Sequence, residues 1–184
     1  MRIITGSARG TRLKSPAGEG TRPTADRTRE ALFSMLGARV YDAQVLDLFA
    51  GTGALALEAL SRGAARAVLV DRTTYAILAE NVRRTKMEAH AELRRGDVYG
   101  QLAALSQEGC TFDLVFADPP YALPELSKLP ELVMNGHLLS EGGIFVLEHP
   151  KTFDFSAYPC FSRQRVYGSV HFSFFIREEA RTDA

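Results

Sequence analysis

Four consecutive residues, Asp118-Pro119-Pro120-Tyr121, follow the apolar stretch 112–117, which is typical of a buried strand. One proline or glycine is enough to end a strand. Two prolines fix φ twice, and Pro119 also restricts Asp118 to an extended conformation. This is more stiffness than a turn requires. The pattern therefore indicates that the carboxylate of Asp118, the carbonyl of Pro119 and the ring of Tyr121 are held in position to bind something.

A second set of residues with chemical potential follows earlier apolar stretches. Within DLFAGTG, Asp47 precedes Gly51 and Gly53. These glycines let the backbone turn sharply and approach a ligand closely. Asp71 ends the next predicted strand, where a carboxylate can bind ribose hydroxyls, and Asp97 ends the third within RRGDV, where it could meet an adenine amino group.

The glycine loop has two interpretations. GTGALA approximates the dinucleotide fingerprint G-x-G-x-x-G/A, and Asp71 lies near the expected distance. Two features favour S-adenosylmethionine over NAD. Asp47 would repel a pyrophosphate but suits an ammonium and a sulfonium, and a dehydrogenase has no use for DPPY. A structural alternative, in which the acids only cap strand ends, is reasonable for one acid but not for four at one sheet edge.

The elements that must position these residues alternate along the chain. Strands are predicted at 44–49, 65–71, within 89–97, 112–117, 142–149, 161–168 and 170–176, and helices at 25–36, 54–63, 73–87, 98–107 and 123–136, the last interrupted by Pro130. This order predicts an α/β, Rossmann-like fold with a mostly parallel seven-stranded sheet, helices on both faces and a C-terminal antiparallel hairpin. Ligands of such folds bind outside the carboxyl ends of the strands, where the acids lie.

Length and charge predict one domain with a basic arm. The chain has 184 residues, 46% of them hydrophobic, and a net charge of zero. Residues 1–30 nevertheless hold seven basic residues and three acids, so the remainder carries −4. We divide the chain into an arm, 1–23, with a small β-hairpin, and a domain, 24–184. A basic arm on an acidic body favours a polyanion partner, although a merely solvated segment is an alternative.

Several classes of protein are not expected. No apolar run approaches the roughly 18 residues of a membrane span, and the first ten residues lack the apolar segment of a secretory signal. Cys110 and Cys160 are isolated, as are the four histidines, so no metal site is predicted. We expect a reduced, cytoplasmic protein.

Taken in order, DLFAGTG, Asp71, Asp97 and DPPY resemble the motifs of a class I S-adenosylmethionine-dependent methyltransferase. DPPY matches the Asp/Asn/Ser-Pro-Pro-aromatic signature of enzymes that methylate amino nitrogens. More narrowly, RIITGSARGTRL, RPTADRTREALFSML and DLFAGTGALALEALSRGA resemble the bacterial 16S rRNA guanine-N2 methyltransferase family, over Arg2 to about His149. Thr5-Gly6, where two glycines are expected, and Tyr121, where relatives often have phenylalanine, depart from that family.

The resemblance implies roles for particular residues. It implies that Asp118 and the carbonyl of Pro119, stiffened by Pro120, orient an exocyclic amine of guanine while Tyr121 stacks on the base. The implied S-adenosylmethionine site comprises Asp47, Phe49, Gly51, Gly53, Asp71, Arg72, Asp97 and Val98. Basic residues of the arm and its flank would hold phosphates of 16S rRNA, within the small subunit or an assembly intermediate: Arg9, Arg12, Lys14, Arg22 and Arg27, and also Arg29. Arg22, Arg27 and their neighbours could instead brace the arm.

Three alternatives stay open at this point. Tyr121 is also typical of adenine-N6 methyltransferases, but such DNA enzymes usually need an extra recognition domain, for which 184 residues leave little room. A non-catalytic RNA-binding protein with this fold would have no reason to keep both DPPY and the glycine loop. A nicotinamide-dependent oxidoreductase would bind NAD instead of S-adenosylmethionine.

Overall fold

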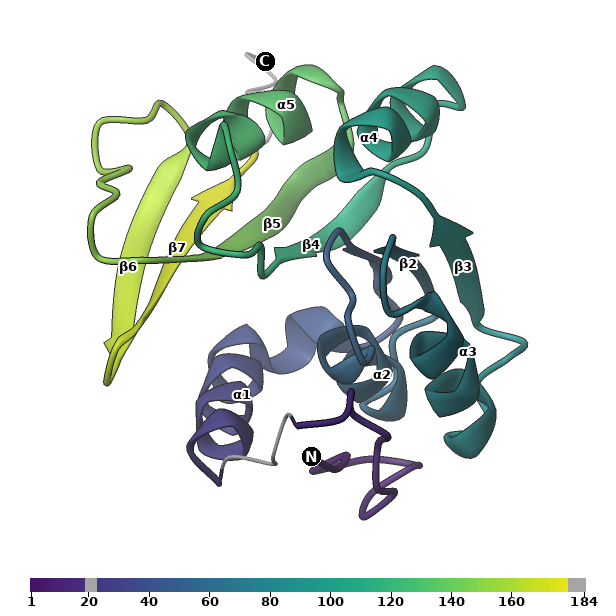
Figure 1. Cartoon of the computed structure of the whole chain (residues 1–184). Coiled ribbons are helices and arrows are strands. Elements are labelled where there is room, and N and C mark those ends of the chain that lie inside the picture. Colours follow the sequence, from purple (N-terminus) through teal and green to yellow (C-terminus); the bar gives the residue numbers. More distant parts are fainter. Residues whose placement is uncertain (19–22, 179–184) are drawn as a thin grey trace.

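The computed structural model describes residues 1–18 and 23–178, and its centre is one seven-stranded sheet (Figure 1). The strands are β1 (Gln44–Asp47), β2 (Arg66–Asp71), β3 (Ala91–Arg95), β4 (Phe112–Ala117), β5 (Leu139–His149), β6 (Phe161–Tyr167) and β7 (Val170–Ile176). Their order is β3-β2-β1-β4-β5-β7-β6. Strands β1 to β5 pair in parallel, and β7 pairs antiparallel with both β5 and β6. The predicted fold class is confirmed.

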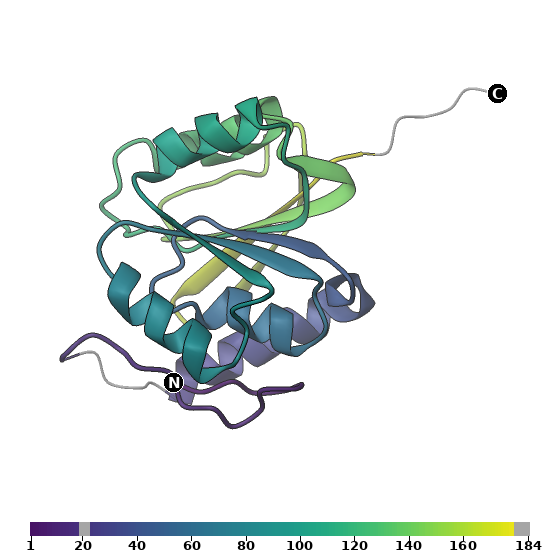
Figure 2. The same ribbon diagram turned by 90° about the vertical axis from the view of Figure 1, so that its right-hand side faces the viewer.

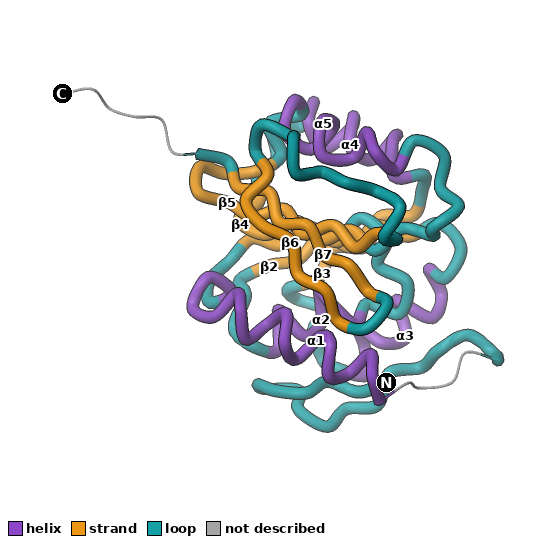
Figure 3. The backbone as a smooth tube through the Cα atoms, turned by 90° about the vertical axis from the view of Figure 1, so that its left-hand side faces the viewer, coloured by secondary structure: helices purple, strands orange, loops and turns teal. Residues whose placement is uncertain are grey.

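Helices cover both faces of the sheet (Figure 3). On one face lie α1 (Pro23–Leu36), α2 (Ala54–Ser61) and α3 (Tyr75–Arg84), and on the other lie α4 (Val98–Gln107) and α5 (Leu129–Asn135). Successive strand residues point to opposite faces. In β4, Leu114 and Phe116 therefore join the core beneath α1 and α2, while Val115 joins the core beneath α4 and α5. This double cover explains why β4 is an almost continuous apolar run.

Pro130 does not interrupt a helix, contrary to the expectation from the sequence. A 3₁₀ turn at Leu126–Lys128 comes first, and α5 begins at Leu129, so Pro130 is its second residue. The amides of the first helical turn have no partner within the helix, so the missing N–H of proline costs nothing there.

Strand order reverses between β1 and β4, because β2 and β3 lie on one side of this pair and β5 on the other. Such a switch point opens a crevice at the carboxyl ends of the two strands. Asp47 ends β1, and Asp118 directly follows β4. The fold thus brings two of the predicted site residues to the crevice from segments about seventy residues apart.

Residues 1–18 of the N-terminal arm lie against the helices α2 and α3 (Figure 2). One antiparallel bridge joins Arg2 and Arg12, which is the core of the predicted small hairpin. The amide of Ser7 donates to the carbonyl of Ser61 at 2.8 Å. At Gly6, φ is +92° and an added Cβ would lie 1.7 Å from the same carbonyl. Only glycine allows this approach of the arm to α2.

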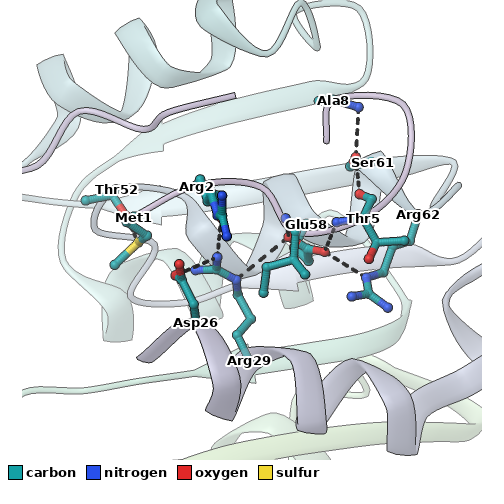
Figure 4. A network of polar contacts seen from close by, with 11 residues as sticks. Met1, Arg2, Thr5, Ala8, Asp26, Arg29, Thr52, Glu58, Ser61 and Arg62 are labelled. Carbon is teal, nitrogen blue, oxygen red and sulfur yellow. Dashed lines mark hydrogen bonds and ion pairs between the residues drawn. The ribbon is translucent and has the colours of Figure 1, made fainter. Parts of the chain in front are cut away.

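Buried Glu58 of α2 ties the arm to the body (Figure 4). Its carboxylate accepts hydrogen bonds from the amides of Ile4 at 2.8 Å and Thr5 at 3.1 Å, and from Arg62 at 2.8 Å. Arg29 of α1 lies 3.8 Å from the same carboxylate and donates to the carbonyl of Arg2. The arm is therefore joined to α1 and α2 through one buried polar cluster.

Candidate active site

A cavity of about 600 Å³ opens at the carboxyl edge of the sheet. Most of its walls are the loops that follow β1, β2, β3 and β4, and Pro16 of the arm adds to them. Ten residues expected from the sequence line it: Phe49, Gly51, Asp71, Arg72, Asp97, Val98, Asp118, Pro119, Pro120 and Tyr121. Asp47 and Gly53 are buried behind the wall instead. The crevice thus unites residues from four separate segments of the chain.

Asp71 joins the glycine loop to the end of β2. One oxygen of its carboxylate accepts from the amide of Gly51 at 3.0 Å, and the other accepts from the amide and hydroxyl of Thr74. An ionised carboxylate has about four acceptor positions. The protein thus holds the side chain in one orientation. The carboxylate can still accept a hydrogen bond from a hydroxyl group of a ligand in the cavity.

Gly53 serves the turn and the packing behind it. Its φ is +84°, and an added Cβ would lie 2.8 Å from a methyl group of Leu78. It also forms the N-cap of α2. Glycine at this position therefore lets the backbone turn from the end of β1, at Asp47, into α2, which begins at Ala54.

Asp47 is a buried acid without an ordinary partner. It is 1% exposed, and within the described ranges neither carboxylate oxygen accepts a hydrogen bond of normal geometry. Burial first, and then the charge of Asp118, raise the pKa of Asp47 to about 7, although the amides of Ala56 and Phe49 partly oppose this. Native buried acids rarely lack partners. An unpaired acid behind the crevice fits a ligand that carries positive charge.

The lining of the crevice has the same bias in charge. It includes three acids, Asp71, Asp97 and Asp118, and among the described residues its only cationic side chain is Arg72. A pyrophosphate would meet repulsion here, whereas an ammonium or a sulfonium would be attracted. The residues present therefore fit S-adenosylmethionine and do not fit NAD.

Asp97 and its neighbours form the wall at the third strand. Asp97 caps α4 by accepting from the amide of Gly100 at 3.1 Å, and its side chain remains exposed. Tyr99, which the motifs do not single out, also lines the cavity, and its hydroxyl donates to the carbonyl of Pro124 at 2.8 Å. This bond fastens the loop after β4 to α4.

The DPPY segment forms the opposite wall. Pro119 is buried, whereas Pro120 and Tyr121 are exposed, Tyr121 by 48%. Among the described residues, none donates a backbone hydrogen bond to the carbonyl of Pro119. Asp118 is open to solvent at the cavity, but protein surrounds it on its other sides, and this desolvation raises its pKa. The segment therefore offers two fixed acceptors beside an accessible aromatic ring.

Glu148 is a site residue that the motifs miss. It lies near the end of β5, and the register Ala117↔Leu147 places it next to Asp118 on the neighbouring strand. Burial, followed by the charge of Asp118, raises the pKa of Glu148, so the two carboxyl groups retain a proton near neutral pH. The hydroxyl of Tyr121 lies 3.4 Å from its carboxylate. An acid at the end of the strand in GGIFVLEH was the only signal in the sequence.

Asp118 also lines a second cavity, of about 390 Å³. This second cavity lies between the arm, α1, α2 and the start of β7. Its lining is Met1, Ala25, Thr28, Arg29, Leu32, Ala54, Leu55, Asp118, Glu148, Ser169, Val170 and Phe172. Within the described part of the chain, Asp118 is the one residue common to the linings of the two cavities. It therefore lies where groups bound in the two cavities would meet.

The predicted phosphate ligands have different surroundings. Arg9 and Arg27 line a third cavity, of about 500 Å³, together with Arg2, Asp26 and Glu30. The side chain of Arg12 lies on the surface of the arm. Lys14 is paired with Glu80 at 2.7 Å. Arg22 lies outside the described residues.

The expectation that Arg29 contacts phosphate is wrong. Its side chain is only 5% exposed and is occupied by Asp26, Glu58 and the carbonyl of Arg2 (Figure 4). A guanidinium in such a position braces the arm and is closed to a large polyanion. Burial thus decides between the two roles that charge alone left open.

The sheet with its switch point, the glycine loop, the acids at the strand ends and DPPY define a class I S-adenosylmethionine-dependent methyltransferase. No helix in the described ranges is long and apolar enough to cross a membrane. The chain belongs to the family described as conserved hypothetical protein 95, whose model matches residues 1–176.

Similar proteins agree with this assignment. Ribosomal RNA small subunit methyltransferase D of Escherichia coli K12 is 35% identical over 194 aligned positions, which cover 100% of this chain and 94% of that protein. A solved hypothetical protein of Thermus thermophilus is 37% identical with a TM-score of 0.83, covering 97% and 99% of the two chains. An RNA methyltransferase from Salinibacter ruber, solved with S-adenosyl-L-homocysteine, is 19% identical with a TM-score of 0.65 over 90% and 98%, which shows a shared fold.

Proposed function

We propose that the protein transfers the methyl group of S-adenosylmethionine to the exocyclic N2 amine of a guanine in 16S rRNA. The observation that carries the proposal is the position of Asp118 at the boundary of two cavities, one of which has a lining whose charge suits the cofactor. The similarity to ribosomal RNA small subunit methyltransferase D supports the class of substrate.

The first cavity would hold the cofactor through residues already fixed by the protein. Asp71 would accept the ribose hydroxyls, since Gly51 and Thr74 hold its carboxylate in place. Asp97 and Val98 would contact the adenine, and Phe49 and Arg72 would complete the walls. Asp47 would contribute negative charge behind the site. Bound S-adenosylmethionine supplies a methyl group that its sulfonium has already activated.

The protein's contribution to the chemistry is placement. The amine of guanine is a poor nucleophile because its lone pair is delocalised into the ring. Asp118 and the carbonyl of Pro119 would each accept one N–H bond and so aim the lone pair at the methyl group. As the N–C bond forms, the S–C bond breaks, and Asp118 is positioned to take the proton that the amine gives up. Tyr121 would stack on the base, which must leave its own stack to reach the site.

The arm would hold the RNA near the site. Arg9 and Arg27 share one cavity, and Arg12 lies on the surface of the same arm, so these three are the best placed to contact phosphates. Lys14 and Arg22 complete the proposed set. In this proposal residues 1–23 are the RNA-binding arm and residues 24–184 are the methyltransferase domain. The substrate would be the small subunit or an assembly intermediate in the cytoplasm.

The deciding experiment uses isotopically labelled S-adenosylmethionine. The protein is offered unmodified small subunits, naked 16S rRNA and DNA in parallel, and the products are digested to nucleosides. We expect labelled N2-methylguanosine from subunits or rRNA. Labelled N6-methyladenine would be consistent with the role of Asp118 but would overturn the proposal that guanine is the target base. No label in any pool, with cofactor bound, would overturn the proposed reaction.

A further inference from the structure

Glu148 has surroundings that a structural role does not explain. It is half-buried beside another acid, Asp118, and among the described residues no lysine or arginine pairs with it. Apart from Asp118, its polar side-chain contact is with the hydroxyl of Tyr121, at 3.4 Å. An acid that is partly removed from water next to a like charge is unfavourable for folding. Its presence at a cavity wall points to a ligand that donates hydrogen bonds.

The pairing of the strands sets the spacing of the two acids. Neighbouring strands lie about 4.8 Å apart, and Glu148 follows Leu147, whose partner on β4 is Ala117. Two acceptors side by side at this spacing suit two donors on adjacent ring positions of one flat ligand. The Watson–Crick edge of guanine presents such donors, the N1–H and the N2 amine.

The second cavity suits a base whose Watson–Crick edge faces the two acids. Its walls are mostly apolar, from Met1, Leu32, Leu55, Val170 and Phe172. The two carboxyl groups come together from the ends of β4 and β5. Pockets for small ligands commonly combine apolar walls with a few converging polar groups. A base with one face against those walls, and its other face free for Tyr121, would turn its polar edge toward Asp118 and Glu148.

We propose that Glu148 determines base specificity by accepting the N1–H of the target guanine while Asp118 accepts from the N2 amine. This rests on the proposed function. Adenine has an acceptor at N1 beside its amine, so it would pair only with a protonated Glu148, whereas guanine pairs with the ionised form, which would face a lone pair on adenine. A site built for a donor rejects analogues that lack it, because its own acceptor is left unpaired. The raised pKa of Glu148 implies that the bound guanine displaces a proton from the acid pair.

The test compares guanine with 2-aminopurine at the modified position of the RNA. The analogue keeps the amine at C2 but carries an acceptor at N1. Wild-type protein should prefer guanine strongly. Glu148→Gln can donate its amide hydrogen to that acceptor, so we expect the ratio of kcat/KM values, guanine over 2-aminopurine, to fall at least about tenfold. A matched control is Glu141→Gln, which changes an exposed acid at the other end of β5.

Two outcomes separate the proposals. An unchanged ratio in Glu148→Gln, with kcat/KM lowered equally on both bases, would overturn the role of Glu148 and leave the proposed function standing. Methylation of adenine by the wild type would overturn both. Should Glu148→Gln be too inactive for kinetics, equilibrium binding of the two RNAs by cofactor-loaded protein gives the same ratio, and cofactor binding shows that the variant is folded.

Discussion

The backbone amide of Gly51 donates a hydrogen bond to the carboxylate of Asp71 at 3.0 Å, which joins the loop after β1 to the end of β2. This bond orients an acid toward the crevice and fixes the loop that forms the crevice floor. The position of the glycine loop and the orientation of the Asp71 carboxylate therefore depend on each other.

Asp71→Ala should weaken cofactor binding. The variant loses a charged acceptor for the ribose hydroxyls and also frees the amide of Gly51, and hydrogen bonds to charged groups are worth about 1.5–3 kcal/mol. We expect the Kd for S-adenosylmethionine, measured by calorimetry, to rise about 10- to 100-fold. Glu131→Ala, an exposed acid on α5, is the matched control and should leave Kd unchanged. An unchanged Kd in Asp71→Ala would place the ribose elsewhere.

Asp118→Ala should stop turnover without loss of the cofactor. The variant removes the acceptor that orients the amine, and misplacement of reacting groups costs about 10²-fold or more. We expect kcat to fall by at least about 10²-fold, while Kd for S-adenosylmethionine changes little. Single-turnover methylation of the RNA and calorimetry on the same preparation separate the two effects. Normal turnover in this variant would contradict the clamp of Asp118 and Pro119.

Asp47→Asn should stabilise the protein in a pH-dependent way. Because the folded-state pKa is raised to about 7, ionisation of Asp47 opposes folding. The cost is absent below about pH 4, where the unfolded acid is also protonated, and it grows as pH rises toward 7. At pH 8 we expect the variant to gain up to about 4 kcal/mol in unfolding free energy, and little at pH 4.

Urea unfolding of the variant and the wild type, without cofactor, at pH 4 and pH 8 measures this gain. The contributions of other titrating groups to the unfolding free energy largely cancel when the two proteins are compared. An equal gain at pH 4 and pH 8 would show that Asp47 is not protonated in the folded protein. The same variant should bind S-adenosylmethionine more weakly, since the negative charge behind the site is lost.

Glu58→Ala should loosen the arm. Breaking a buried ion pair leaves its partners unsatisfied and typically costs about 3–5 kcal/mol. Arg29, Arg62 and two amides of the arm depend on this carboxylate. We expect a loss of about 3–5 kcal/mol in urea unfolding and faster hydrogen exchange in residues 1–14. Glu80→Ala, whose ion pairs with Lys14 and Arg84 are exposed and screened by water, should cost much less. Equal losses would refute the bracing role.

Replacing Arg9 and Arg27 together with alanine should weaken RNA binding and its dependence on salt. Each lost phosphate contact lowers the slope of log K against log salt by roughly one unit. The control is the double replacement of Arg39 and Arg66 by alanine. It removes the same amount of positive charge at the amino ends of the strands, away from the carboxyl edge that holds the site. There Arg39 donates a hydrogen bond to the carbonyl of Gly142, and Arg66 begins β2. If both double variants shift affinity and slope alike, the arm does not hold RNA at these residues.

Local pattern in the sequence was enough for much of the fold. Helix α4 and strands β4 and β7 begin and end where the periodicity predicts, because each is bounded by its own turn signals. The prediction that Pro130 interrupts a helix is wrong for a local reason, since proline both ends helices and begins them. Which of these applies depends on where the preceding turn packs.

The sequence by itself determined the class of protein, because its chemistry resides in short motifs at strand ends: DLFAGTG, Asp71, Asp97 and DPPY. Parallel strands carry such residues to one edge by topology alone. Only the tertiary structure decided which acids meet. The parallel pairing of β4 with β5 places Glu148 next to Asp118. The packing of the arm against α1 and α2 turns the side chain of Arg29 inward to Glu58. Burial and charge proximity depend on contacts between distant segments, which no local pattern encodes.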